Sequence, residues 1–234
     1  PKIAITTGGA DTMECLVRKL GVDDAEIGLT GDDRRIHLYH GNGTPSFAGG
    51  FGGGSGDLPE ATTVWNTPAT LKAYDITILS CEGTQNPNTK QQPALDAMQE
   101  YANVGGRVFA SHWHNIWVSG NFENNNPNLA PAEWKDLVDW NSTNNFNGNV
   151  TIDEVNNPKG MLFADWMVNV GASPAMRGLF DVQEGRTTAQ TIADTTKVER
   201  WVVRDDHPQM FQFTTPVNVT PDQKCGKVVF TDMH

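Results

Sequence analysis

Two pairs of potential metal ligands stand at the ends of strand-like runs. His112 and His114 form one pair, and Asp232 and His234 form the other. On an extended backbone, residues i and i+2 project to the same side, so each pair is expected to offer two ligands to one ion. A tetrahedral set of imidazoles and a carboxylate suits zinc, which lowers the pKa of a bound water toward about 7. The four residues therefore predict a divalent transition-metal site, with zinc the best fit; the alternative is that His112 is a core or hydrogen-bonded histidine and His234 a frayed chain end.

Cys81 and Glu82 follow a third apolar run, residues 74–80. Glu82 is expected to be a metal ligand or the general base that activates water, with a carboxylate on a solvated loop as the alternative. Cys81 at a strand end is a candidate nucleophile with a lowered pKa and with His112 as its base. The alternatives for Cys81 are a disulfide to Cys15 or a buried, inert thiol.

A third group of residues has the chemistry of ligand binding. Thr7, Gly8 and Gly9 precede a predicted helix and are candidates for an anion cradle, with a tight turn as the alternative. The dinucleotide pattern G-x-G-x-x-G is absent, so no nucleotide cofactor is expected. Trp113 and Trp117 flank the histidine pair and are candidates for stacking on a sugar ring, with packing in the core as the alternative.

These residues come together only if the strand-like runs form one parallel sheet. The predicted strands cover residues 2–7, 35–40, 74–80, 107–112, 197–204, 210–214 and 226–232. The predicted helices cover residues 12–20, 67–73, 93–104 and 160–170. Strands that alternate with helices indicate an α/β fold with a doubly wound, mainly parallel sheet of the flavodoxin-like type, which places ligands beyond the carboxyl ends of its strands.

The length of 234 residues favours one enlarged domain over residues 1–234. Residues 41–60 form a Gly-rich loop, because the eight glycines between 41 and 56 are incompatible with a regular element. Residues 121–158 are Asn-rich and are expected to form an insertion beyond the sheet edge. Because the chain begins at Pro1 and ends directly after a strand-like run, we expect it to be part of a longer protein.

Composition excludes several classes of partner. A formal charge of −11 disfavours nucleic acid and anionic membrane surfaces. No apolar run approaches the roughly 18 residues of a membrane span, so no membrane insertion is expected. A surface with few lysines and many Asn, Thr and Gly favours an extracytoplasmic or secreted protein.

Residues 74–79, 95–102 and 105–112 together resemble the class I glutamine amidotransferase-like superfamily, in particular its ThuA-like branch. In that branch an apolar strand preceded by Tyr-Asp leads to a helix and then to a Gly-Gly strand that ends in His. The resemblance implies that Ser111 or His112 lies where amidotransferases carry a nucleophilic cysteine in G-x-C-x-G. Since the sequence here is Ala-Ser-His-Trp-His, glutaminase chemistry is not expected. The resemblance also links the chain to sugar metabolism or hydrolysis, and to large exported bacterial proteins.

Three functions follow from these residues. The leading hypothesis is a metal-assisted hydrolase that acts on a small ester-like or carbohydrate-like substrate. The second is a non-catalytic module of a cell-surface protein that binds a glycan or peptide in the same crevice. The third is a thiol enzyme that depends on Cys81.

Overall fold

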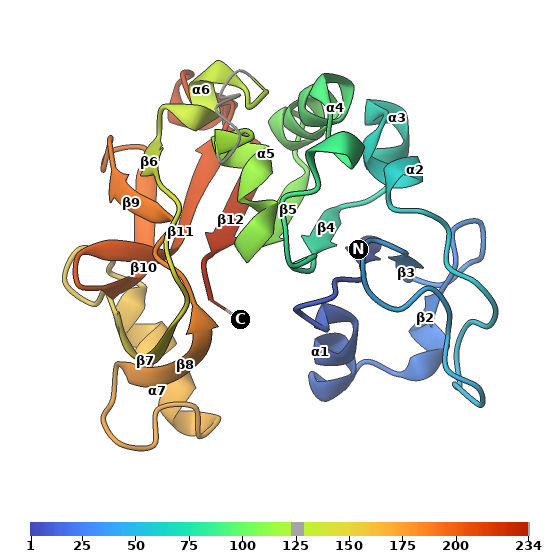
Figure 1. Cartoon of the computed structure of the whole chain (residues 1–234), viewed down its shortest axis with the longest axis horizontal. Coiled ribbons are helices and arrows are strands. Elements are labelled where there is room, and N and C mark those ends of the chain that lie inside the picture. Colours follow the sequence, from blue (N-terminus) through green and yellow to red (C-terminus); the bar gives the residue numbers. More distant parts are fainter. Residues whose placement is uncertain (123–128, 234) are drawn as a thin grey trace.

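A computed structural model describes residues 1–122 and 129–233. Within these ranges the chain forms one ten-stranded sheet, a separate two-stranded sheet and several short helices. None of the helices in the described ranges is long and apolar enough to cross a membrane. The doubly wound α/β architecture expected from the sequence is confirmed (Figure 1).

The large sheet has a parallel half and an antiparallel half. From β2 to β12 in spatial order, neighbouring strands are parallel, and from β12 to β8 they are antiparallel. In spatial order the strands are β2 (Ile27–Gly28), β3 (Ile36–Tyr39), β1 (Ile3–Thr6), β4 (Ile76–Leu79), β5 (Arg107–Ser111), β12 (Gly226–Thr231), β11 (His207–Thr215), β10 (Val198–Arg204), β7 (Phe146–Ile152) and β8 (Leu179–Gly185). The small sheet pairs β6 (Val138–Trp140) with β9 (Ala189–Ile192).

Helices cover both faces of the parallel half. Helices α2, α3 and α4 lie along one face, α1 lies on the other, and α7 packs beside β7 and β8 (Figure 1). The α-helices are α1 (Met13–Lys19), α2 (Thr62–Trp65), α3 (Pro68–Leu71), α4 (Gln92–Asn103), α5 (Ile116–Ser119), α6 (Ala132–Lys135) and α7 (Gly160–Asn169). The 3-10 helices are Asp24–Glu26, Pro87–Thr89, His112–Asn115 and Pro221–Gln223.

Helix α4 anchors the larger hydrophobic core. Its buried side chains, among them Leu95, Met98 and Tyr101, face the sheet at helical spacing and pack with Val108 and Phe230. Because these strand residues alternate with more exposed neighbours, β5 and β12 bury mainly the face that α4 covers. This packing fixes the level at which the parallel strands end, and therefore the position of the residues that follow them.

The expected insertion over residues 121–158 is not separate from the sheet. Strand β7 lies within this range and pairs with β10 and β8, which extends the main sheet beyond its parallel half. Its first half contains the run Asn147-Gly148-Asn149, residues of low β-propensity that concealed the strand. Residues 123–128 of the same range lie outside the described residues.

The Gly-rich loop, residues 41–60, contains no helix or strand, as expected. It is nevertheless held by specific backbone bonds, since Phe47 N donates to Gly56 O at 3.0 Å and Leu58 N donates to Pro45 O at 2.8 Å. The loop folds back over β2 and covers one edge of the parallel sheet.

Backbone segments approach one another closely at Gly8, which follows β1. A Cβ atom added there would lie 2.2 Å from the carbonyl oxygen of Cys81, and Gly43 packs against Gly8 from the other side. Glycine is therefore required at position 8 for packing, because any side chain would push two backbone segments apart.

We expect Gly8→Ala to destabilise the fold by about 1–3 kcal/mol, the usual cost of overpacking a filled site. The matched control is Gly49→Ala in the same protein, since no atom lies within 4 Å of a Cβ added there. Urea unfolding of both variants measures the difference. Equal stability of Gly8→Ala and Gly49→Ala would contradict the close packing.

Candidate functional site

The order of winding reverses between β1 and β4. From β1 the chain first adds β3 on one side and later β4 on the other, so the carboxyl ends of these three strands border a crevice at which α/β proteins commonly bind ligands. Thr7 follows β1, His40 follows β3, and Cys81 with Glu82 follows β4. The sequence prediction placed the site at this edge of the sheet, and the strand order brings these residues to it.

The start of the Gly-rich loop fills the space directly between β1 and β4. Asn42 N donates to Thr7 O at 3.1 Å, and Asn42 Nδ2 donates to Glu82 O at 2.9 Å. Thr7 Oγ1 donates to Thr44 O at 3.1 Å. Thr7 and Gly8 are buried by these contacts. Thr7 and Gly8 of the predicted anion cradle therefore pack chain segments together, whereas Gly9 is exposed.

Glu82 forms a buried ion pair with Lys90. Lys90 Nζ donates to Glu82 Oε2 at 2.6 Å, and the exposed fractions of the two side chains are 1% and 4%. Asn86 Nδ2 donates to the same oxygen at 2.7 Å, and His114 Nε2 lies 3.9 Å from Oε1. Burial raises the pKa of Glu82, but the Lys90 ammonium and the Asn86 amide outweigh it and leave that pKa below its ordinary value.

Lys90 and Asn86 are functional candidates that the sequence analysis missed. They reach Glu82 because residues 83–90 turn back on themselves, with Asn86 in a left-handed conformation at φ 46° before the 3-10 helix Pro87–Thr89. One sequence signal was available, since Lys90 is the only Lys or Arg between Lys72 and Arg107. The sequence alone, however, does not show which carboxylate Lys90 pairs with.

A cavity of about 170 Å³ opens beside this ion pair. We call it the switch-point pocket; its lining residues are His40, Gly41, Asn42, Glu60, Ala61, Thr62, Trp65, Glu82, Asn86 and Thr89. His40 Nδ1 and Glu60 Oε1 lie 3.2 Å apart at the rim, and the Glu60 side chain is 65% exposed. The pocket thus has a buried charged wall and a polar, accessible rim.

His114 has a structural role behind the pocket. Trp117 Nε1 can only donate, so its 2.9 Å bond makes His114 Nδ1 the acceptor and leaves the proton on Nε2. Nε2 then donates to Ser80 O at 2.9 Å. Burial lowers the pKa of His114 to about 4, so the ring is neutral. Both nitrogens are therefore engaged, and neither is available to bind a metal ion.

His112 does not share the direction of His114. The prediction assumed an extended backbone, whereas His112 begins the 3-10 helix His112–Asn115 and adopts a left-handed φ of 44°. Its Nδ1 lies 3.2 Å from Cys81 Sγ. The i, i+2 geometry on which the metal prediction rested is absent here, because the strand ends at Ser111.

The Asp232 carboxylate is likewise occupied by hydrogen bonds within the protein. Its carboxylate accepts hydrogen bonds from Thr188 Oγ1 at 2.7 Å and from Ala189 N at 3.2 Å, and burial raises its pKa to about 6. His234 lies outside the described residues. Among the described residues, no group of three or more His, Cys, Asp or Glu side chains is placed to hold a metal ion. The described members of the predicted set, His112, His114 and Asp232, are therefore not brought together at one metal site.

The Cys81 thiol contacts His112, but this contact does not lower the pKa of the thiol. Its side chain is buried, and burial raises the pKa of the thiol to about 12. A neutral thiol is a weak nucleophile, so the contact with His112 is a hydrogen bond within the core. Cys15 and Cys225 are exposed free thiols, so the expected alternative of a Cys15 to Cys81 disulfide is wrong.

The two predicted stacking residues are buried. Trp117 packs against Trp65 with ring centroids 5.4 Å apart, and Arg186 lies over Trp113 at 4.6 Å. Their exposed fractions are 1% and 7%, so neither presents an open platform to a sugar ring. The core interpretation of both residues is the correct one.

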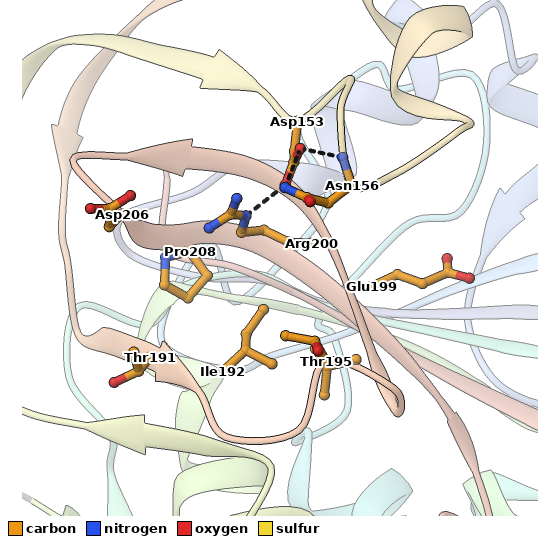
Figure 2. A pocket seen from close by; sticks show the side chains of 10 residues that line it. Asp153, Asn156, Thr191, Ile192, Thr195, Glu199, Arg200, Asp206 and Pro208 are labelled. Atoms are coloured by element: carbon orange, nitrogen blue, oxygen red, sulfur yellow. Dashed lines mark hydrogen bonds and ion pairs between the residues drawn. The ribbon is translucent and has the colours of Figure 1, made fainter.

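A larger cavity of about 540 Å³ lies in the antiparallel half (Figure 2). Two of its charged side chains form an ion pair, since Arg200 Nε donates to Asp153 Oδ2 at 2.7 Å, and Asn156 N donates to Asp153 Oδ1 at 2.9 Å. Figure 2 shows Asp206 and Glu199 on opposite sides of Arg200. The Asp153 cluster fixes a turn, and the switch-point pocket is the candidate functional site.

Similarity to known proteins is confined to the fold. No protein-family model matches the sequence, and a search of curated proteins found no significant match. A ThuA-like protein from Bacteroides uniformis is 13% identical with a TM-score of 0.51, and the match covers 99% of this chain and 81% of that one. Two cytoplasmic proteins of Salmonella typhimurium are 12% and 11% identical with TM-scores of 0.48, over 100% and 99% of this chain and 87% of each of theirs.

The architecture defines an α/β protein of the flavodoxin-like class. Within that class its fold is ThuA-like, as the resemblance in the sequence implied.

We expect Lys90→Met to cost about 3–5 kcal/mol in the free energy of unfolding, because the Glu82 carboxylate would stay buried without its partner. The double variant Lys90→Met with Glu82→Gln should recover much of this loss. Lys72→Met, which removes an exposed pair with Glu100, should cost less than about 1 kcal/mol. Urea unfolding distinguishes these cases, and a loss for Lys90→Met no larger than that for Lys72→Met would show that the pair is not buried.

Proposed function

We propose that the protein binds a small hydroxyl-rich ligand, a sugar or a sugar derivative, in the switch-point pocket, with Glu82 as the main hydrogen-bond acceptor. The observation that carries this proposal is that Glu82, in the pocket wall, forms a buried ion pair with Lys90 behind it. Burying two charges costs several kcal/mol per ion, and apolar residues of the same volume often stabilise a fold as well or better. Stability alone therefore does not account for an ion pair beside a cavity.

The chemistry of the lining supports a hydroxyl-rich ligand. Sugar hydroxyls donate to carboxylates and accept from amides, and the pocket offers Glu82 and Glu60 as acceptors with Asn42 and Asn86 as donors. Two carboxylates, in a chain of net charge −11, disfavour phosphorylated or carboxylate ligands. At about 170 Å³ the cavity is smaller than the roughly 300 Å³ at which drug-sized ligand sites begin, which favours a ligand of one sugar ring.

This proposal retains the glycan-binding function considered from the sequence but moves it to different residues. Metal-assisted hydrolysis and Cys81-dependent catalysis stay untested predictions with no support from the geometry of His114, Asp232 or Cys81. Secretion likewise stays a prediction from composition.

We also propose membership of the class I glutamine amidotransferase-like superfamily. The ThuA-like fold supports it, and so does the left-handed conformation of His112 at a strand-to-helix turn, where the resemblance places the nucleophile of the amidotransferases.

Calorimetry against a panel of monosaccharides, sugar acids and polyols tests the function. We expect a neutral sugar to bind, and Glu82→Gln to weaken it about tenfold or more, because a hydrogen bond to a charged group contributes roughly 1.5–3 kcal/mol. Glu60→Gln at the exposed rim avoids any folding defect and should also weaken binding. The matched control Glu100→Gln removes an exposed carboxylate outside the pocket and should leave affinity unchanged. Absence of binding across the panel, or binding that neither pocket variant weakens, would overturn the proposal.

A further inference from the structure

A second cavity of about 170 Å³ lies on the α1 side of the sheet. It is enclosed by α1, β2, β3 and the Gly-rich loop, and we call it the α1 cavity. Most of its wall is apolar, and the apolar lining residues are Ile27, Leu38, Phe47, Ala48, Phe51 and Leu58. Its polar lining residues are Glu14, Cys15, Arg18, Thr44 and Ser46.

The glycines of the loop create this cavity. A Cβ atom on Gly53 would lie 2.1 Å from Asp24 O, and one on Gly54 would lie 2.8 Å from the Phe47 ring, so the loop passes over β2 at backbone contact distance. This tight course stacks Phe47 on Phe51, with ring centroids 5.3 Å apart and planes 11° apart. Two ring faces and a strand edge thus form a fixed apolar wall.

The charges around the α1 cavity are unequally compensated. Arg18 donates two hydrogen bonds to the Asp24 carboxylate, at 2.7 Å and 3.1 Å, and its guanidinium lies over Phe51. Glu14 has no such cation, and its buried Oε2 has no hydrogen-bond partner among the described residues. Burial and the nearby Asp11 raise the pKa of Glu14, although its own backbone N–H acts in the opposite sense.

A buried carboxylate oxygen without a donor is costly, and a ligand that donates to it removes that cost. An apolar wall with a single uncompensated negative group selects an apolar molecule with one positive charge, and aromatic faces add attraction for a cation. An engineered cavity of about 150 Å³ lined by Leu, Ile and Phe holds one benzene ring, which sets the scale of the apolar body.

We propose that the α1 cavity binds a small amine whose apolar body is the size of one aromatic ring and whose ammonium group pairs with Glu14. This site is separate from the switch-point pocket and does not rest on its proposed function. The two cavities share no lining residue.

The chain contains a reporter for the α1 cavity and an internal reference. Cys15 lines the cavity and is exposed, whereas Cys225 is exposed and does not line it. The native protein is alkylated, and peptide mass spectrometry follows the reaction at both cysteines. The rate at Cys15 then reports occupancy of the α1 cavity, and the rate at Cys225 reports general thiol reactivity in the same sample. The probes are 2-phenylethylamine, its neutral analogue 2-phenylethanol and the acid 3-phenylpropionate.

The amine should slow alkylation of Cys15 several-fold and leave Cys225 unchanged, the alcohol should protect Cys15 less, and the acid should not protect it. Glu14→Gln should abolish the advantage of the amine over the alcohol, whereas Glu26→Gln, which changes an exposed carboxylate outside the lining, should keep it. Unchanged Cys15 alkylation with the amine, or equal protection by all three probes, would overturn the proposal.

Discussion

The ion pair between Glu82 and Lys90 organises the carboxyl end of β4. It closes the turn of residues 83–90, which brings Lys90 back beneath the strand end just before α4 begins at Gln92. Asn86 joins the same carboxylate, and the backbone of Glu82 receives Asn42 from the Gly-rich loop. Two loops that are distant in sequence therefore meet at one residue, and the switch-point pocket lies between them.

The Gly-rich loop contributes to both proposed binding sites. Its first residues, Gly41 and Asn42, line the switch-point pocket, and residues 44–51 line the α1 cavity. Both contributions depend on backbone contact that side chains would prevent, at Gly43 against Gly8 and at Gly53 against Asp24. The high glycine content of this segment thus has a packing explanation, because the loop follows the surface of the sheet closely.

The parallel half of the fold could be predicted because its signals are local. Continuous apolar runs produced β4 and β5, and helical spacing produced α4. Strand β7 could not be predicted, because Gly148 and Asn149 are held by pairing with β8, and Thr151 and Ile152 by pairing with β10, both distant in sequence.

The sequence could place Glu82 at a strand end, but not the groups that it contacts there. Strand ends placed Glu82 correctly, but the directions of His112 and His114 depend on a 3-10 helix that begins one residue after β5. The role of His114 is set by Trp117 and Ser80, and the role of Glu82 by Lys90. Such pairings arise from tertiary packing, so they could not be inferred from residue types and their spacing along the chain.

Lys90 and Asn86 hold Glu82 ionised in the wall of the switch-point pocket. Carbon-13 NMR of the glutamate carboxyl groups across a pH titration, with the Glu82 signal assigned by its loss in Glu82→Gln, measures this directly. We predict a midpoint below 4.5, the ordinary pKa of a glutamate side chain, because its polar neighbours outweigh burial. A midpoint above 4.5 would show that burial dominates, and it would contradict a charged acceptor in the switch-point pocket.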